Sequence, residues 1–203
     1  MMSGTPPPRR VVVAITGASG AVYGARLLEL LRELGHETHV VVSRAGALAL
    51  QQELGIEARA LGQRSDFFYS AADVGARIAS GSFRTHAMAI APCSIRTLAE
   101  IATGVTSSLV TRAADVMLKE RRRLVLVVRE TPLHTGHIRR MLEASEAGAI
   151  ILPPVPAFYF HPQTIGQMVD QTVHRILDLM EIAHGFGAAW DGIAPADRAG
   201  AGA

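Results

Sequence analysis

The sequence predicts an α/β fold in which one doubly wound parallel sheet lies between two layers of helices. Strand-like and helix-like segments alternate along the chain, and the strand-like segments are continuous apolar runs, as expected of strands covered on both faces. With 203 residues, 49% apolar and 19% charged, the chain can bury one core. We therefore expect a single domain over residues 11–184, with tails 1–10 and 185–203 that are disordered alone or docked on a partner.

The first strand–turn–helix unit is the most informative segment. Val11–Ile15 is a β-branched run, Gly17–Gly20 is a tight glycine turn, and the helix that follows ends at Gly35. The first amides of a helix have no intrahelical partner and attract phosphate, and Ser19 adds a hydroxyl donor. The turn is therefore predicted to bind a phosphate, although such turns also serve plain strand-to-helix packing.

Four more strands and five more helices follow from the same alternation. Right-handed crossovers make all five strands parallel, as in Rossmann-like (flavodoxin-like) three-layer αβα folds. Residues 55–86 are expected to be irregular. The strands are predicted at Thr38–Val42, Ala87–Ala91, Leu124–Val128 and Ala149–Leu152, and the helices at about 45–54, 97–104, 107–122, 134–147 and 165–183.

Composition argues against several classes of protein. A net charge of +2 gives no reason to expect nucleic acid as a partner, and no apolar run is long enough for a bilayer. The N-terminus lacks the apolar core of a signal peptide, so we expect a cytoplasmic protein. The single cysteine, Cys93, is interpreted as a packing residue. His134, His137 and His161 lack companions at metal-ligand spacing, so no metal is expected.

Polar residues follow each predicted strand. They are Ser19, Ser43, Cys93–Ser94, Arg129–Glu130 and, after the last strand, Tyr159. Because open α/β sheets bind ligands at the carboxyl ends of their strands, this pattern indicates a site there.

Missing motifs narrow the ligand. The turn is not G-x-G-x-x-G, the second strand ends in Ser43 rather than an acid, and no Gly-Lys-Ser/Thr follows, which argues against NAD and against a P-loop. No tyrosine lies four residues before Lys119, so a short-chain dehydrogenase is excluded. Lys119 is the only lysine among 20 cationic residues. A mononucleotide such as FMN remains, and Lys119 is either a chance surface residue or a point charge for one phosphate.

Six segments, in order, resemble the UbiX/Pad flavin prenyltransferases over about residues 11–182. They are ITGASGA, ASGSF, APCS, RAADVMLKERR, LVLVVRETPL and AFYFHP. The resemblance implies a transferase that joins a dimethylallyl group from dimethylallyl monophosphate to N5 and C6 of reduced FMN. It also implies a UbiD-type decarboxylase as recipient of the prenylated FMN, and a homo-oligomer, possibly a dodecamer.

The resemblance further implies roles for individual residues. The proposed leaving phosphate needs preorganised cations, and a carboxyl group can move the proton displaced at C6. The implied FMN contacts are Gly17, Ala18, Ser19, Ser43, Ser94, Ile95, Arg96, Thr97 and Arg129. The implied prenyl-phosphate contacts are Lys119, Tyr159 and Arg175 with Ser80, Gly81 and Ser82, and the implied catalytic residues are Glu130, Glu53, Lys119, Tyr159 and Arg175.

Two other functions stay open. One is an FMN-dependent decarboxylase of the related cysteine-decarboxylase flavoproteins. The other is a non-catalytic flavin-binding accessory protein, which gains support if Lys119, Tyr159 and Arg175 fail to converge on one pocket.

Overall fold

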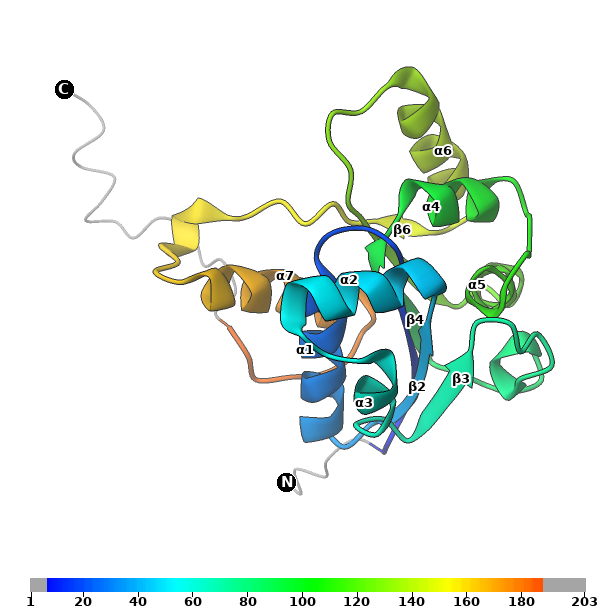
Figure 1. Cartoon of the computed structure of the whole chain (residues 1–203), viewed down its shortest axis with the longest axis horizontal. Coiled ribbons are helices and arrows are strands. Elements are labelled where there is room, and N and C mark those ends of the chain that lie inside the picture. The colour runs from blue at the N-terminus through cyan, green and yellow to red at the C-terminus, as the bar shows by residue number, and fades with distance from the viewer. Residues whose placement is uncertain (1–6, 188–203) are drawn as a thin grey trace, which may run out of the picture.

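The computed structural model describes residues 7–187 and contains one parallel sheet of six strands in the order β3-β2-β1-β4-β5-β6 (Figure 1). From β1 the chain builds outward through β2 and β3, then returns to place β4 on the other side of β1. The switch point between β1 and β4 is where such sheets bind ligands. The strands are β1 Arg10–Ile15, β2 Glu37–Val42, β3 Phe67–Ser70, β4 Ala87–Cys93, β5 Arg123–Val128 and β6 Ile150–Ile151.

Helices cover both faces of the sheet, which confirms the predicted three layers. Along β1, Val11, Val13 and Ile15 face one core and Val12 and Ala14 face the other, because strand side chains alternate. The first core is closed by α1 Ala21–Glu33, α2 Arg44–Leu54, α3 Ala58–Gly62 and α7 Ile165–Leu179. The second is closed by α4 Ile95–Ala102, α5 Leu109–Lys119, α6 Thr135–Glu146 and the 3-10 turn η1 Arg77–Ala79.

One expectation for the fold was wrong. The segment 55–86, expected to be irregular, contains α3, η1 and the edge strand β3. β3 has four residues whose side chains are alternately half-buried and exposed, so it lacks the long apolar run that marks the central strands. At the chain ends, β1 already includes Arg10, and Phe186 stacks on His174. Residues 1–6 and 188–203 of the expected tails lie outside the described part.

The two edges of the sheet are well separated. Carboxyl ends of the parallel strands lead into the turns after β1, β2, β4 and β5, whereas the end of α5 and the loop 80–86 lead into the amino ends of β5 and β4. A six-residue strand such as β5 spans about 20 Å. Side chains at opposite edges of one chain therefore do not meet.

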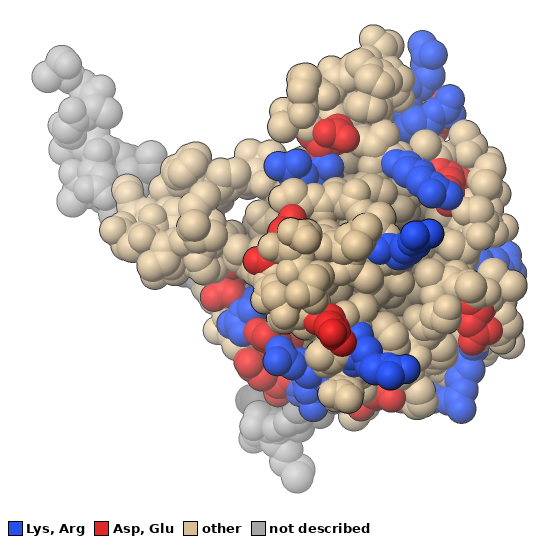
Figure 2. All heavy atoms as spheres, in the orientation of Figure 1, with Lys and Arg blue, Asp and Glu red and all other residues tan. Residues whose placement is uncertain are grey.

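Residues 152–164, here called the arm, join β6 to α7 and extend away from the sheet (Figure 1). The arm contains four prolines and no Lys, Arg, Asp or Glu. In Figure 2 it is the tan projection on the left, without the blue and red that mark charged residues. Its aromatic residues are exposed, Phe158 to 68%. Within residues 7–187 no helix combines the length and apolar character needed to cross a membrane.

Candidate functional site

Thr16 locks together the turns on both sides of the switch point. Its hydroxyl donates to the Pro92 carbonyl at 2.8 Å and accepts from the Ser94 amide at 2.8 Å. The turn after β5 joins the same network, because the Arg129 amide donates to the Cys93 carbonyl at 3.2 Å. The backbone of Ser94 and of Arg129, both implied FMN contacts, is therefore held in one hydrogen-bond network at the carboxyl edge of the sheet.

The turn after β1 also packs tightly on the start of α2. A Cβ added to Gly17 would collide with the Cβ of Ala45, so only glycine permits this approach. The Ser43 amide donates to the Ile15 carbonyl at 3.0 Å, and the Ser43 hydroxyl caps α2 by accepting from the Gly46 amide at 3.0 Å. Gly17–Ser19 and Ser43 are thus brought together, as the predicted FMN contacts require.

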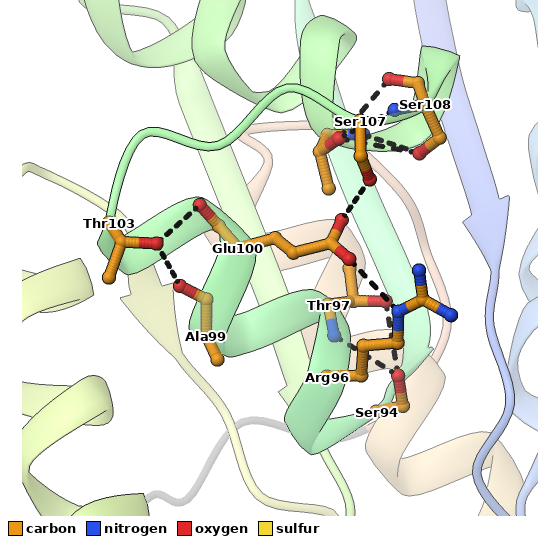
Figure 3. A network of polar contacts seen from close by, with 9 residues as sticks. Ser94, Arg96, Thr97, Ala99, Glu100, Thr103, Ser107 and Ser108 are labelled. Atoms are coloured by element: carbon orange, nitrogen blue, oxygen red, sulfur yellow. Dashed lines mark hydrogen bonds and ion pairs between the residues drawn. The ribbon is translucent and has the colours of Figure 1, made fainter.

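The segment Ser94–Thr97 forms the first turn of α4 at this edge. The Ser94 hydroxyl caps the helix by accepting from the Thr97 amide at 3.3 Å. The Arg96 side chain is 84% exposed, and its Nε donates to Glu100 Oε1 at 2.9 Å. Glu100 lies between Arg96 and Ser107, whose hydroxyl donates to Glu100 Oε2 at 2.7 Å (Figure 3). The N-terminus of helix α4 thus places the hydroxyls of Ser94 and Thr97 and the exposed Arg96 side chain at the carboxyl edge of the sheet.

Glu53 corrects the expectation that the first amides of α1 are open to a ligand. Its carboxylate accepts from the Gly20 amide at 2.9 Å and from the Ala21 amide at 2.8 Å. The positive end of the helix is therefore already satisfied by a carboxylate of α2. A ligand phosphate at this edge is left with the exposed part of the turn, Gly17–Ser19, and with Ser43.

Lys119 and the loop Ser80–Ser82 lie together, but at the opposite edge of the sheet. Lys119 is the last residue of α5, and its Nζ lies 2.5 Å from Glu120 Oε1. The hydroxyls of Ser80 and Ser82 are 2.8 Å apart, and Gly81 faces the Lys119–Glu120 pair. These residues form a second polar cluster rather than part of the crevice.

Tyr159 and Arg175 lie in a third part of the molecule, away from both the crevice and the Lys119 cluster. Both line a groove of about 980 Å³ between the arm and α7, and Arg175 Nη1 lies 3.5 Å from Asp178 Oδ2. Helix α7 packs on the face of the sheet opposite to α5. Glu130 lies at the crevice edge beside Arg129, and accepts from the Thr131 amide at 3.0 Å. Within one chain Lys119 therefore does not converge with Tyr159, Arg175 and Glu130.

Cys93 is buried in the second core, and this burial raises the pKa of its thiol well above the usual range. Such a thiol stays protonated at neutral pH, in agreement with a packing role. Among residues 7–187, no group of three or more His, Cys, Asp and Glu is arranged to hold a metal ion.

The role of Thr16 was not predicted from the sequence. Its signal was a hydroxyl residue at the end of an otherwise apolar strand, directly before the glycine turn. Nor was the contact of Arg122 with the Ser80–Ser82 loop predicted, because nothing in the sequence distinguishes Arg122 within the charged run Lys119–Arg123.

A family model described as Flavoprotein matches residues 2–181 of the chain. The match covers most of the sequence, and the sheet order with its interlocked turns is typical of nucleotide-binding α/β proteins. The chain is therefore a member of the flavoprotein family.

Sequence similarity then defines the branch of that family. The chain is 52% identical over 175 residues to flavin prenyltransferase UbiX of Escherichia coli strain K12, covering 86% of this chain and 93% of the relative. It is 47% identical over 188 residues to the mitochondrial flavin prenyltransferase PAD1 of Saccharomyces cerevisiae, covering 93% and 78%. The chain belongs to the UbiX flavin prenyltransferases, which confirms the resemblance.

Solved structures agree with this placement. AnUbiX (PadA1), in complex with FMN and dimethylallyl pyrophosphate, superposes with a TM-score of 0.89 at 46% identity, covering 92% of this chain and all of that one. A dodecameric FMN-dependent UbiX-like decarboxylase from Escherichia coli O157:H7 gives 0.87 at 45%, covering 90% and all. A PPC decarboxylase, 21% identical with a TM-score of 0.61 over 74% of this chain and 84% of that one, shares the fold alone.

Proposed function

We propose that this protein binds reduced FMN at the carboxyl edge of its sheet and joins a dimethylallyl group to N5 and C6 of the flavin. The observation that carries the proposal is the interlocking of three turns at the switch point, where Gly17–Ser19, Ser43 and Ser94–Thr97 lie together. The exposed Gly17 and Ser19 backbone and the hydroxyls of Ser43 and Ser94 suit a phosphate and a flavin ring. When bound, reduced FMN would supply N5 and C6 as the nucleophilic atoms for two different carbons of the prenyl group.

The cations and the carboxyl group of the chain would carry the remaining chemistry. Cleavage of the allylic C–O bond of dimethylallyl monophosphate leaves a phosphate, whose charge Lys119 and Arg175 would stabilise while the Tyr159 hydroxyl donates a hydrogen bond. The second bond, to C6, requires a proton on the alkene of the prenyl group and releases the proton of C6. Glu130, next to Arg129, would carry both proton transfers. The product would be prenylated FMN for a UbiD-type decarboxylase, made in the cytoplasm.

We further propose that the complete site forms between copies of the chain. Lys119 and Glu130 are separated by the length of β5, which no lysine side chain spans. The arm exposes Val155, Phe158 and Phe160, an apolar surface of the kind that marks protein interfaces. A homo-oligomer, like the dodecameric relative, would bring Lys119 of one copy to Tyr159 and Arg175 of another.

The test is anaerobic incubation of the pure protein with reduced FMN and dimethylallyl monophosphate, followed by mass spectrometry of the released flavin. We expect FMN with one added five-carbon unit. Glu130→Gln should bind FMN as before and form the adduct more slowly. Protein that binds FMN yet forms no adduct would contradict the proposal and favour the accessory-protein function, which the separation of Lys119 from Arg175 within one chain supports.

A further inference from the structure

Lys119, the implied phosphate ligand, does not stand alone at the end of α5. Its Nζ lies 2.5 Å from Glu120 Oε1, and this contact lowers the pKa of Glu120. The carboxylate is therefore ionised at neutral pH. Any anion that reaches the Lys119 ammonium must approach a second, negative group at the same place.

The end of α5 is built to hold this pair. The Arg122 amide donates to the Met117 carbonyl at 2.8 Å and the Arg121 amide to the Leu118 carbonyl at 3.0 Å, with Arg121 in the left-handed region (φ 52°). This double closure reverses the chain directly after Glu120. Glu120 is the C-cap residue of the helix, so its backbone position is fixed by the helix end.

Arg122 then ties the Ser80–Ser82 loop to the same spot. Its side chain is only 15% exposed, and it donates to the Gly81 carbonyl at 2.6 Å and the Phe83 carbonyl at 3.1 Å. A Cβ on Gly81 would collide with Glu120 Oε1 and lie 2.8 Å from Lys119 Nζ. The glycine backbone thus packs directly on the Lys119–Glu120 pair, which holds the exposed carboxylate beside the Lys119 ammonium.

We propose that Glu120 selects the phosphate group of the prenyl donor, favouring a monophosphate over a diphosphate. The inference rests on the proposed function, in which Lys119 holds that phosphate. A phosphate oxygen bonded to Nζ at about 2.8 Å lies within roughly 5 Å of Glu120 Oε1. Like charges at such distances repel, and the repulsion grows with each charge of the ligand. A diphosphate carries more negative charge than a monophosphate, so Glu120 penalises it more.

The choice of donor is open within the family. AnUbiX was crystallised with dimethylallyl pyrophosphate, so a related protein binds the diphosphate. In the present chain Lys119 lies against Glu120, Arg122 already donates to two carbonyls, and Arg112, which donates to the Ala79 carbonyl, is paired with Asp115. The cluster therefore offers a limited positive charge, which suits one phosphate better than two.

The experiment compares the wild type with Glu120→Gln, which keeps the shape of the side chain and removes its charge. Steady-state adduct formation is measured with dimethylallyl monophosphate and with the diphosphate. We expect the wild type to prefer the monophosphate, and Glu120→Gln to reduce that preference in kcat/KM by about tenfold, mainly through a lower KM for the diphosphate. Glu120→Asp should keep the preference, and Glu146→Gln, an exposed carboxylate at the end of α6, serves as the matched control.

Calorimetric titration of the FMN-loaded protein with inorganic phosphate and with pyrophosphate gives a second readout that does not depend on turnover. Glu120→Gln should tighten pyrophosphate binding several-fold more than phosphate binding, with FMN affinity unchanged. Equal use of both donors by the wild type, or the same preference in wild type and Glu120→Gln, would overturn the inference. A wild type that forms no adduct with either donor contradicts the proposed function instead. The titration then tests by itself whether Glu120 disfavours the binding of pyrophosphate.

Discussion

The crevice at the β1/β4 switch point and the arm with α7 are opposite kinds of structure. At the crevice, buried Thr16 joins two turns and Gly17 packs on α2, so each implied FMN contact is placed by its own chain. The arm instead carries exposed aromatic residues, and the groove that Tyr159 and Arg175 line is open along α7. Contacts within the chain hold the first region in place, whereas the second region leaves apolar side chains exposed.

Under the proposed function, this difference separates the region expected to bind the cofactor from the region expected to bind the prenyl phosphate. A rigid crevice can hold the flavin because its turns are fixed by hydrogen bonds and close packing. The proposed phosphate ligands Lys119 and Arg175 come from helices on opposite faces of the sheet, so in our proposal their meeting depends on how copies assemble. Variants in the two regions should therefore fail in different ways.

The largest effect on turnover is expected from removing the positive charges of Lys119 and Arg175, the two side chains proposed to bind the prenyl phosphate. Lys119→Met and Arg175→Met should each slow turnover by roughly 100- to 1,000-fold, since each removes a charge that stabilises the leaving phosphate. Hetero-oligomers that contain both variants should recover about a quarter of wild-type activity, because random mixing reunites an intact Lys119 with an intact Arg175. Differently tagged chains are co-expressed, and the doubly tagged oligomers are purified and assayed. No recovery would place both residues of a site in one copy.

A second variant tests the crevice. Gly17→Ala should weaken FMN binding by at least about tenfold and lower the free energy of unfolding by about 1–3 kcal/mol, because the added methyl collides with Ala45. The matched control is Gly185→Ala, whose added Cβ meets nothing within 4 Å. FMN affinity is measured by quenching of flavin fluorescence, and unfolding by urea titration. Unchanged FMN affinity in Gly17→Ala would remove the turn from the cofactor site.

A pair of threonines compares the two regions directly. Thr16→Val should cost about 1–3 kcal/mol of folding stability, because the buried Ser94 amide loses its acceptor. Thr164→Val removes the exposed cap of α7 and should cost about 1 kcal/mol or less. Thr16→Ser, which keeps the hydroxyl, is the control in urea unfolding. Equal losses at Thr16 and Thr164 would contradict the distinction between a fixed crevice and an open arm.

The smallest effect is on the pH dependence of stability. Burial lowers the pKa of His39, more than the adjacent Glu37 carboxylate raises it. The unfolded chain therefore takes up a proton first, and stability falls as the pH drops below about 6.5, until the folded-state pKa is reached. His39→Gln should flatten this fall by at most about 1.4 kcal/mol per pH unit, as measured by thermal unfolding between pH 7.5 and 5. An unchanged slope would show that other groups, such as His36 and His86, carry the dependence.

Much of the fold and of the crevice could be predicted because local patterns encode them. Apolar runs predicted five of the six strands, β1, β2, β4, β5 and β6. The polar residues that follow these runs indicated the edge of the sheet where a ligand is expected to bind. β3 could not be predicted, since its edge position leaves only a weak alternation in four residues. Nor could the role of Glu53 at the start of α1, because that contact joins residues more than 30 positions apart.

By itself the sequence determined the layers of the fold, the glycine turn and the family. Only the tertiary structure decided that the implied site residues fall into three places: the crevice, the Lys119 cluster with Glu120, and the groove beside the arm. The physical reason lies in the sheet. Residue order fixes which strand end or helix end a side chain occupies, but the distance between two ends depends on strand length and on the face each helix covers.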